Sequence, residues 1–477
     1  MTLAKENFAL NSTSLTNIVF SFFPFSFILG NLAININILL FCCLGIFQLR
    51  SRILKIKFDF PLKIVFLFFL IIFFSTSLSF IKSLYFEGYE HENLIRLIKS
   101  IAFLRFFLLL LIIYILFEFN VLNFKYFLLT ATCSSILVAL DIIYQYFFDS
   151  NIIGLKPIGI YHNTGFFGDE LIAGGFIQDF SFFTVLFLAF SFKNKNYIKY
   201  IFIISTICIL GLGILFSGNR MSLILFLIGL LLIFFFNNEL KKIISISLVV
   251  LFVLMKLIFS SDEKMRGYYT NLYANTIGQL MLLKDRSKQK KEIKEESPEN
   301  QLVEKQRDTK AFPQSSFVFG ESHRARLIMT ALDIWSRNKI FGNGIKSFRM
   351  DCQKLFFKNP EYNITVFLIK GKKNRLCSTH PHNYYVEVLT ETGLVGLSIM
   401  LIIALLFCIF IFKNLKLFKE NKIGNFLILS STVCLILEMF PLQSTGSVFT
   451  THDMAYIILI SSFILSYKKI IDDKSLK

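Results

Sequence analysis

The sequence predicts an all-α integral membrane protein with about 12 transmembrane helices and one large periplasmic loop. Of its 477 residues, 55% are hydrophobic and 59 are Phe, and the mean hydropathy is +0.62. A soluble core of this size needs fewer apolar residues. The net charge of +18 is carried mostly by short loops beside apolar runs, so anionic membrane lipids explain it better than nucleic acid does.

Twelve apolar runs approach the length of roughly 20 residues that crosses a bilayer core about 30 Å thick. They lie near 15–31, 33–49, 60–82, 98–118, 126–148, 175–193, 199–217, 221–237, 242–260, 393–413, 424–442 and 452–468. Basic residues fall on every second loop, for example Arg50 after the second run and Lys241 after the eighth. By the positive-inside rule, these loops and both termini are cytoplasmic. We therefore expect a multi-pass protein of the bacterial inner (cytoplasmic) membrane whose other loops face the periplasm.

This alternation divides the chain into three regions. Residues 1–260 form spans one to nine, residues 261–382 form the large periplasmic loop, and residues 383–477 form the last three spans. Within the loop, residues 285–310 are charged and lack aromatic residues, which predicts a disordered insert. The segment 321–348 regains helical spacing, ends in a Gly-Asn-Gly turn, and is expected to lie over the membrane helices.

Cys352 and Cys377 are the only two of the eight cysteines in the large loop. In an oxidising compartment they can form a disulfide that holds the approach to His380, and we favour this interpretation. Two free thiols are the alternative, because sequence does not supply the distance between them.

The segment 380–397 is the most distinctive, since it joins two histidines and an amide to an apolar helix. If His380 caps this helix, Pro381 takes its first position and His382 and Asn383 lie in its first turn. The helix dipole disfavours an imidazolium there, so a neutral His382 suits a general base near neutral pH. The alternative is a pair of interfacial histidines.

The same helix carries a polar stripe and two glycines. Asn383, Glu387 and Glu391 recur every four residues, while Gly393 and Gly396 would let another helix approach closely. The alternative is that the glycines simply pack the helix.

The motif His382-Asn383, followed after nine residues by Gly393-Leu-Val-Gly396, is similar to the signature of the O-antigen ligase and O-antigen polymerase family. The expected spans and the large loop extend this resemblance over most of the chain. The resemblance implies a metal-independent, inverting glycosyltransferase with a GT-C-like fold and no cofactor. Such an enzyme moves a glycan from an undecaprenyl-diphosphate carrier to a sugar hydroxyl, and His382 carries over as the catalytic base.

The resemblance also implies outward arginines that bind the diphosphate. The segment Ser217-Gly-Asn-Arg220 resembles the family's Ser/Arg turn, although two residues separate Ser217 from Arg220 where a compact pair is expected. Arg324 and Arg326 precede the Gly-Asn-Gly turn, as the family's loop arginine does. A guanidinium suits a diphosphate leaving group without a metal, because it stays charged and offers paired donors. The alternative is that these side chains extend to lipid headgroups.

Further candidates for substrate binding are His380, Asn383 and three charged residues. Asp169 and Glu170 lie in a glycine-rich outward loop that suits sugar binding or, equally, a re-entrant turn. Arg105 lies in a predicted span, where it would pair with Asp141 or approach the lipid diphosphate.

Other chemistry is weakly supported. The sequence has no phosphate-loop, C-x-x-C or H-E-x-x-H motif, and the two histidines of the 380–397 segment lack an evident third metal ligand. We favour a ligase that transfers the finished glycan to lipid A-core, with a polymerase that joins repeat units as the alternative. A transporter or flippase is the non-enzyme alternative, with Arg105, Asp141 and Lys256 lining its pathway, but no repeat relates the two halves.

Overall fold

The computed structural model describes residues 12–50, 53, 58–87, 90–159, 161–191, 196–270, 323–358, 376–420, 422–441, 443 and 445–467. In these ranges the regular structure is helical, apart from one isolated bridge between Ile158 and His162. The predicted all-α membrane class is confirmed. The charged segment 285–310 lies outside the described residues.

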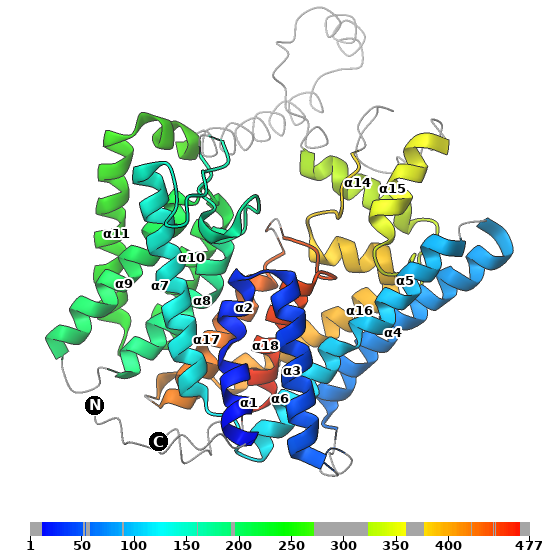
Figure 1. Cartoon of the computed structure of the whole chain (residues 1–477), viewed down its shortest axis with the longest axis horizontal. Coiled ribbons are helices and arrows are strands. Elements are labelled where there is room, and N and C mark those ends of the chain that lie inside the picture. The colour runs from blue at the N-terminus through cyan, green and yellow to red at the C-terminus, as the bar shows by residue number, and fades with distance from the viewer. Residues whose placement is uncertain are drawn as a thin grey trace, which may run out of the picture.

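Figure 1 shows the helices, whose bounds follow in chain order. They are α1 (Ser12–Ser21), α2 (Phe23–Ile28), α3 (Asn31–Leu49), α4 (Phe60–Lys82), α5 (Glu90–Phe103), α6 (Arg105–Glu118), α7 (Phe124–Phe148), α8 (Ala173–Ser191), α9 (Asn196–Phe216), α10 (Arg220–Phe236), α11 (Lys241–Ser261), α14 (His323–Trp335), α15 (Ser347–Lys358), α16 (Tyr384–Lys413), α17 (Ile423–Glu438) and α18 (Thr451–Leu465).

The described part contains 8 helical segments long and apolar enough to cross a membrane. Three shorter apolar helices, α10, α17 and α18, accompany them. The first predicted span, 15–31, is divided into α1 and α2, and Pro24 lies in the first turn of α2. A proline is tolerated there because the first turn needs no N–H donor. Many membrane helices are therefore confirmed, whereas the number of 12 stays a prediction.

Helix α8 lies at the centre of the helical assembly. Its apolar window is 78% buried, more than that of any other long helix in the described part. It packs against α7, α9, α10 and α17, and α18 packs against α6 and α17. Phe side chains fill the space between helices, as where Phe127 meets the rings of Phe183 and Phe463 at right angles. Such edge-to-face contacts suit aromatic rings, so the high Phe content supplies the core.

One end of the molecule carries the long connections, and we call it the loop end. It comprises residues 149–172, 262–270, 323–383 and 441–450 as far as they are described, and it is at the top of Figure 1. Helices α14 and α15 lie here against the start of α16. They enclose a separate small apolar cluster that contains Leu327, Ile334 and Phe348 and that Val386 of α16 contacts. The predicted helix after residue 321 thus covers the beginning of a membrane helix.

Helix α16 begins at Tyr384, well before the predicted span at 393, and it is broken at Gly393. Gly393 has φ 69° and ψ −166°, a conformation that L side chains rarely adopt. A Cβ on Gly393 would lie 2.2 Å from the carbonyl oxygen of Ile340. The close partner of Gly393 is therefore the turn before α15. The prediction that another helix approaches closely at this position is wrong. At Gly396 the nearest group is the hydroxyl of Thr392 in the same helix, so the close approach of another helix at this glycine stays a prediction.

Candidate functional site

The break in α16 is filled by the Gly-Asn-Gly turn at 342–344, which replaces the missing helical hydrogen bonds. Leu394 donates to the carbonyl of Lys339 at 2.9 Å, and Gly344 donates to that of Glu391 at 2.8 Å. Unpaired backbone groups are costly inside a membrane, so a broken helix needs such partners. The turn thereby ties α14 and α15 to the membrane helix that follows the histidines.

Arg96 of α5 holds this turn from the other side. Its guanidinium donates to the carbonyl oxygens of Asn343 and Ile345, the latter at 3.1 Å. Thr76 of α4 accepts a hydrogen bond from the backbone N–H of Ile345 at 3.0 Å. The turn is therefore enclosed by α4, α5 and α16. Arg96 also donates to the side chain of Asn93 at 2.6 Å, but the sequence does not mark Arg96, because its backbone acceptors in the turn lie far along the chain.

The histidines precede α16 and are not part of its first turn, so the predicted capping is wrong. Asn383 is the N-cap, and its side chain accepts a hydrogen bond from the N–H of Val386 at 3.1 Å. His382 stands before the cap with φ 57°. A non-glycine residue in this region is uncommon and often marks a functional constraint. The short polar side chain of Asn is a favoured N-cap, which explains why the helix starts here.

His382 is fixed through its backbone and its ring. Its carbonyl accepts from the N–H of Thr445 at 3.2 Å, and its Nδ1 lies 3.3 Å from the Thr445 carbonyl oxygen. A carbonyl only accepts, so this contact favours a proton on Nδ1 and makes Nε2 the basic nitrogen. The ring of His380 lies beside it, with the centroids 4.1 Å apart.

His380 is held in its neutral form. Burial, and then the neighbouring charge of His382, lower the pKa of His380 to about 4. Its Nδ1 lies 2.9 Å from the hydroxyl of Thr379. Its buried Nε2 meets no hydrogen-bond partner among the described residues. Near neutral pH, His380 thus offers one uncharged nitrogen at the side of His382.

Behind the histidines lies a network that joins α15, α16 and the segment before α18. Lys346 donates from its backbone to Glu391 at 2.6 Å and from Nζ to the hydroxyl of Ser447 at 3.2 Å. Ser447 donates in turn to Glu387 at 2.5 Å, and Val448 N–H donates to the same carboxylate at 2.9 Å. Both glutamates are about 1% exposed. The predicted polar stripe therefore faces the protein, where it binds the loop end.

Lys346 has two unusual properties. Its φ is 60°, which again is uncommon for a non-glycine residue. Burial lowers the pKa of Lys346, and the nearby Arg349 adds to that effect, while Glu391 and Glu387 oppose it. Its charge also contributes to the environment of His380. The sequence analysis missed Lys346, since its partners lie 45 and 101 residues away along the chain.

Arg220 lies in a second polar region, at the start of α10. Its guanidinium carbon is 3.5 Å from the centre of the Tyr268 ring, a cation–π contact. The Tyr268 hydroxyl donates to the carbonyl of Gly218 at 3.0 Å, and its ring stacks on Tyr161 at 4.7 Å. The Nε of Arg220 is buried and has no described hydrogen-bond partner. We call Tyr161, Tyr268, Gly218 and Arg220 the Arg220 cluster.

The turn of residues 217–220 is closed tightly by the predicted outward loop. A Cβ on Gly218, which has φ 74°, would lie 2.1 Å from the carbonyl oxygen of Tyr161. Only glycine fits this approach, which gives a physical reason for one of the two residues between Ser217 and Arg220. The glycine-rich loop and the Ser/Arg turn thus form one unit at the loop end.

The remaining predicted residues lie in several places. Arg324 is exposed and Arg326 is half-buried, both in the first turns of α14, and the Nε of Arg326 has no described hydrogen-bond partner. Asp169 and Glu170 are exposed at the tip of their loop. Asn383 donates from its amide to the carbonyl of Pro441 at 2.9 Å, which makes it part of the scaffold around His382.

Arg105 and Asp141 do not pair, so that prediction is wrong. Arg105 donates to the carbonyl of Ala102 at 2.6 Å and to the hydroxyl of Thr451 at 3.1 Å. Asp141 accepts from the N–H of Ile152 at 3.0 Å and from the amide of Asn151 at 3.3 Å. Each side chain therefore has hydrogen-bond partners of its own, although the buried Nε of Arg105 has none among the described residues.

Cys352 and Cys377 are joined in a disulfide, with their Cα atoms 5.5 Å apart. The disulfide connects α15 to the segment that leads into His380 and His382. Cys352 also lies in the small apolar cluster with Leu327 and Phe348. The approach to the histidines is therefore tied to α15 and, through this cluster, to α14, which carries Arg324.

These features define a multi-span membrane protein whose imidazoles and cations gather at one end. Residues 201–401 match the family model described as O-antigen ligase. The match spans Arg220, Arg324, Arg326 and His382, and it agrees with the predicted resemblance to the O-antigen ligase and polymerase family. No curated protein matches the chain significantly. Members of this family act on lipid-linked glycans in the bacterial inner membrane.

Proposed function

We propose that this protein transfers a glycan from an undecaprenyl-diphosphate carrier to a sugar hydroxyl, on the periplasmic side of the inner membrane. The match to the O-antigen ligases over residues 201–401 carries this proposal, because it contains the proposed base, His382, and the three arginines proposed to bind the diphosphate. We favour ligation to lipid A-core. Both termini are then cytoplasmic, and the loop end faces the periplasm, in agreement with the basic loops.

In the proposed reaction His382 is the general base. Its Nε2 accepts the proton of the acceptor hydroxyl as that oxygen attacks the anomeric carbon. The bond from the anomeric carbon to the diphosphate oxygen breaks, undecaprenyl diphosphate leaves, and the configuration at the carbon inverts. The contact between Nδ1 and the Thr445 carbonyl supports this role, since it directs the basic lone pair to Nε2.

Arg220, Arg324 and Arg326 would stabilise the charge that develops on the diphosphate. No metal is needed in this proposal, because guanidinium groups stay protonated and bind phosphate oxygens in pairs. The buried Nε atoms of Arg220 and Arg326 have no described acceptor within the chain. A buried donor without a partner is costly, so a phosphate oxygen would remove that cost in the complex.

Neighbouring groups would keep His382 in its basic form. The neutral His380 adds no positive charge beside it at neutral pH. Asn383 fixes the backbone after His382 through the Pro441 carbonyl. Asp169 and Glu170 remain candidates for binding the acceptor, because both carboxylates are exposed at the loop end.

His382→Ala tests the mechanism directly. We expect transfer to fall by a factor of about 100 or more, which is what one general base contributes, with an unchanged unfolding temperature. The measurement is the formation of glycan-bearing lipopolysaccharide on a gel from cells that carry each variant. His91→Ala is the matched control, because His91 is exposed at the start of its membrane helix. Full transfer by His382→Ala would contradict the mechanism.

A polymerase is the second candidate, since the family contains both activities. Deletion of the gene separates them. Lipid-linked long chains that fail to reach lipopolysaccharide indicate a ligase, whereas a core that bears one repeat unit indicates a polymerase. If lipid-linked glycan still crosses the membrane in cells with His382→Ala but no product forms, the result supports the enzyme over a transporter without covalent chemistry.

A further inference from the structure

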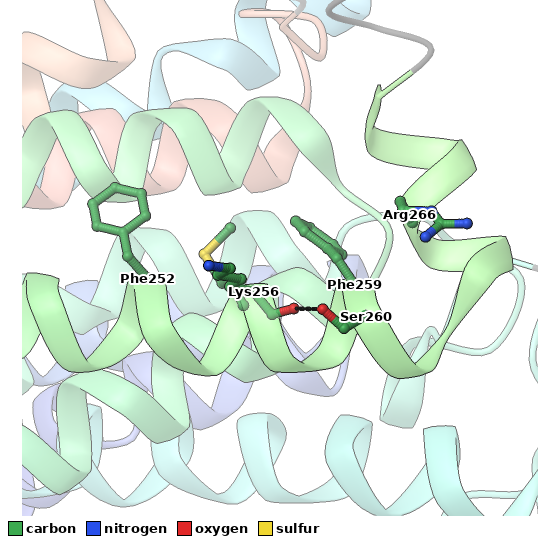
Figure 2. Close-up of a pocket in the computed structure, with 6 residues that line it drawn as sticks. Phe252, Lys256, Phe259, Ser260 and Arg266 are labelled. Atoms are coloured by element: carbon green, nitrogen blue, oxygen red, sulfur yellow. Dashed lines mark hydrogen bonds between the residues drawn. The ribbon is translucent and has the colours of Figure 1, made fainter.

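A shallow groove of about 400 Å³ runs along the half of α11 nearest the loop end. Figure 2 shows the side chains that line it, with Arg266 above the end of the helix. Its lining residues are Phe252, Met255, Lys256, Phe259, Ser260 and Arg266. Three of these are large and apolar, and two are cations.

The groove opens toward the surface that contacts lipid. On α11, Val249, Phe252 and Leu257 are 64%, 53% and 58% exposed, whereas Leu251 on the opposite face is fully buried. Only 28% of the apolar window of α11 is buried inside the protein. In a membrane protein such an exposed apolar face contacts lipid chains, so the groove is open to the bilayer.

The two cations lie where a lipid headgroup would meet them. Lys256 is exposed, and it stands five residues before the end of α11, which is about 8 Å along a helix. No described residue forms an ion pair with its ammonium group. A cation in this position is stabilised by a phosphate at the membrane surface.

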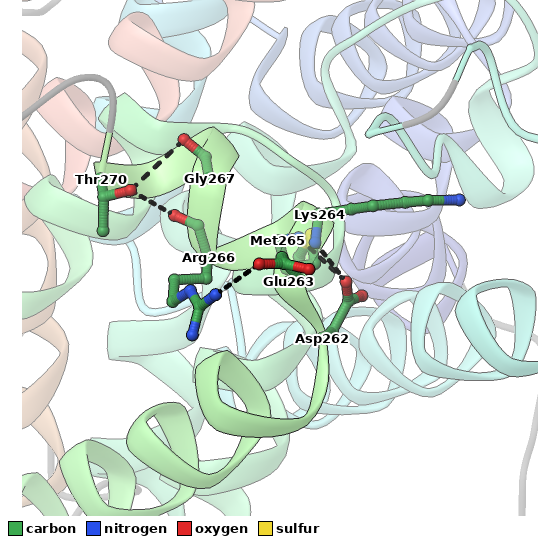
Figure 3. Close-up of polar contacts among 7 residues, drawn as sticks. All are labelled: Asp262, Glu263, Lys264, Met265, Arg266, Gly267 and Thr270. Atoms are coloured by element: carbon green, nitrogen blue, oxygen red, sulfur yellow. Dashed lines mark hydrogen bonds and ion pairs between the residues drawn. The ribbon is translucent and has the colours of Figure 1, made fainter.

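Arg266 is held in place beside the groove. It donates to Glu263 at 2.8 Å, one turn earlier in the short helix at 263–270. Figure 3 shows this ion pair, together with the hydrogen bonds from Lys264 and Met265 to Asp262 that cap the helix. The other terminal nitrogen of Arg266 and its Nε can donate hydrogen bonds to an anion.

The short helix also connects the groove to the Arg220 cluster. Tyr268, which follows Arg266 closely in that helix, lies under the guanidinium of Arg220. Tyr269 donates to the carbonyl of Leu215 at 2.8 Å, and this fixes the helix against the end of α9. The short helix therefore carries Arg266 at the groove and, two residues later, the ring that holds Arg220.

We propose that this groove binds the isoprenoid chain next to the diphosphate of the lipid-linked donor, with Lys256 and Arg266 beside the phosphates. The inference rests on the proposed function, which requires a lipid diphosphate, and it adds the path by which that lipid reaches Arg220 from the bilayer. Apolar side chains suit the isoprenoid chain, and separated cations suit a headgroup that carries two phosphates rather than one.

Native mass spectrometry of the purified full-length protein tests the site without any transfer reaction. The probe is undecaprenyl diphosphate without a glycan, and phosphatidylglycerol is the competing anionic lipid. We expect Lys256→Gln to bind undecaprenyl diphosphate about fivefold more weakly, which is what one cation contributes near a membrane surface. Lys256→Arg should restore the binding.

Lys241→Gln is the matched control. Lys241 lies at the other end of the same helix, with its ammonium 5.6 Å from the centre of the Phe234 ring. Unchanged binding by Lys256→Gln, or an equal loss in Lys241→Gln, would overturn the proposal. Equal occupancy by phosphatidylglycerol would overturn it as well, because the groove would then be a general lipid site. A protein that binds the diphosphate normally but transfers no glycan contradicts the proposed function alone.

Discussion

Lys346 lies among the carboxylates of Glu387 and Glu391, whereas the guanidinium of Arg220 lies on an aromatic ring. Glu387, Glu391, Lys346 and Ser447 form a closed set of hydrogen bonds between three segments. Arg220 lies on Tyr268 and keeps a buried donor without a described acceptor. The first arrangement fixes a structure, because each polar group already has its partner. The second leaves binding capacity for an anion from outside the chain.

This difference separates two tasks in the proposed reaction. The base must stay in place relative to α16, and the network around Lys346 provides rigidity there. The donor must arrive from the membrane and leave again, and the buried Nε of Arg220 has no described acceptor that would compete with it. We expect substitutions in the first region to affect folding most, and substitutions in the second to affect binding.

Gly393→Ala should have the largest effect on stability. Alanine is strained at φ 69°, and its Cβ would meet the Ile340 carbonyl at 2.2 Å, so we expect a loss of about 3 kcal/mol or more. The measurement is the unfolding temperature of the protein in detergent. Gly267→Ala is the control from the short helix beside Arg220, where a Cβ meets nothing within 4 Å. A Gly393→Ala protein as stable as this control would show that the break in α16 is dispensable.

Lys346→Met should have the next largest effect. It removes the cation between Glu387 and Glu391, and the loss of one partner from a buried set costs about 2 kcal/mol. Thermal unfolding measures the loss. Lys346→Arg keeps the charge and should recover part of the stability. Wild-type stability of the Met variant would mean that the two carboxylates do not need this cation.

Tyr268→Leu should have the smallest effect on folding. It removes the ring under Arg220, and a cation–π contact is worth about 0.5–1 kcal/mol at such a site. We expect the KM for the lipid-linked donor to rise about two- to fivefold while kcat and the unfolding temperature stay close to those of the wild type. Tyr268→Phe keeps the ring and loses only the hydrogen bond to Gly218. If the Phe variant is affected as strongly as the Leu variant, the hydroxyl matters and the ring does not.

The sequence predicted the helical membrane class well, because hydropathy and loop charge are properties of consecutive residues and need no knowledge of distant contacts. It also singled out His382 and Arg220, since both stand in local motifs, and their roles stay predictions. It failed where contacts are distant in sequence. In the sequence Lys346 and Arg96 are ordinary basic residues, because their roles depend on the packing of the turn at 342–344 against α16 in three dimensions. The predicted pair of Arg105 and Asp141 failed as well, because Arg105 donates to the hydroxyl of Thr451, which is distant in sequence, while Asp141 accepts from the nearby backbone of Ile152.

The helix start shows a different kind of failure. Pro381 suggested a first helical position, but Asn383 is the stronger cap and moves the start to Tyr384. The glycine at 393 was ambiguous, since a glycine within an apolar run is compatible with close helix packing or with a break. Its positive φ depends on a turn that lies outside the helix, and only the three-dimensional structure reveals it.

The repair of α16 by the 342–344 turn also has a consequence for the order of assembly. Asn343 and Thr390, whose backbones it joins, are 47 residues apart, and the turn is the earlier of the two. A ribosome therefore delivers the turn before the helix that needs it. When α16 enters the bilayer, the partners for its broken backbone have already been synthesised, and the exposed N–H and carbonyl groups can be satisfied at once.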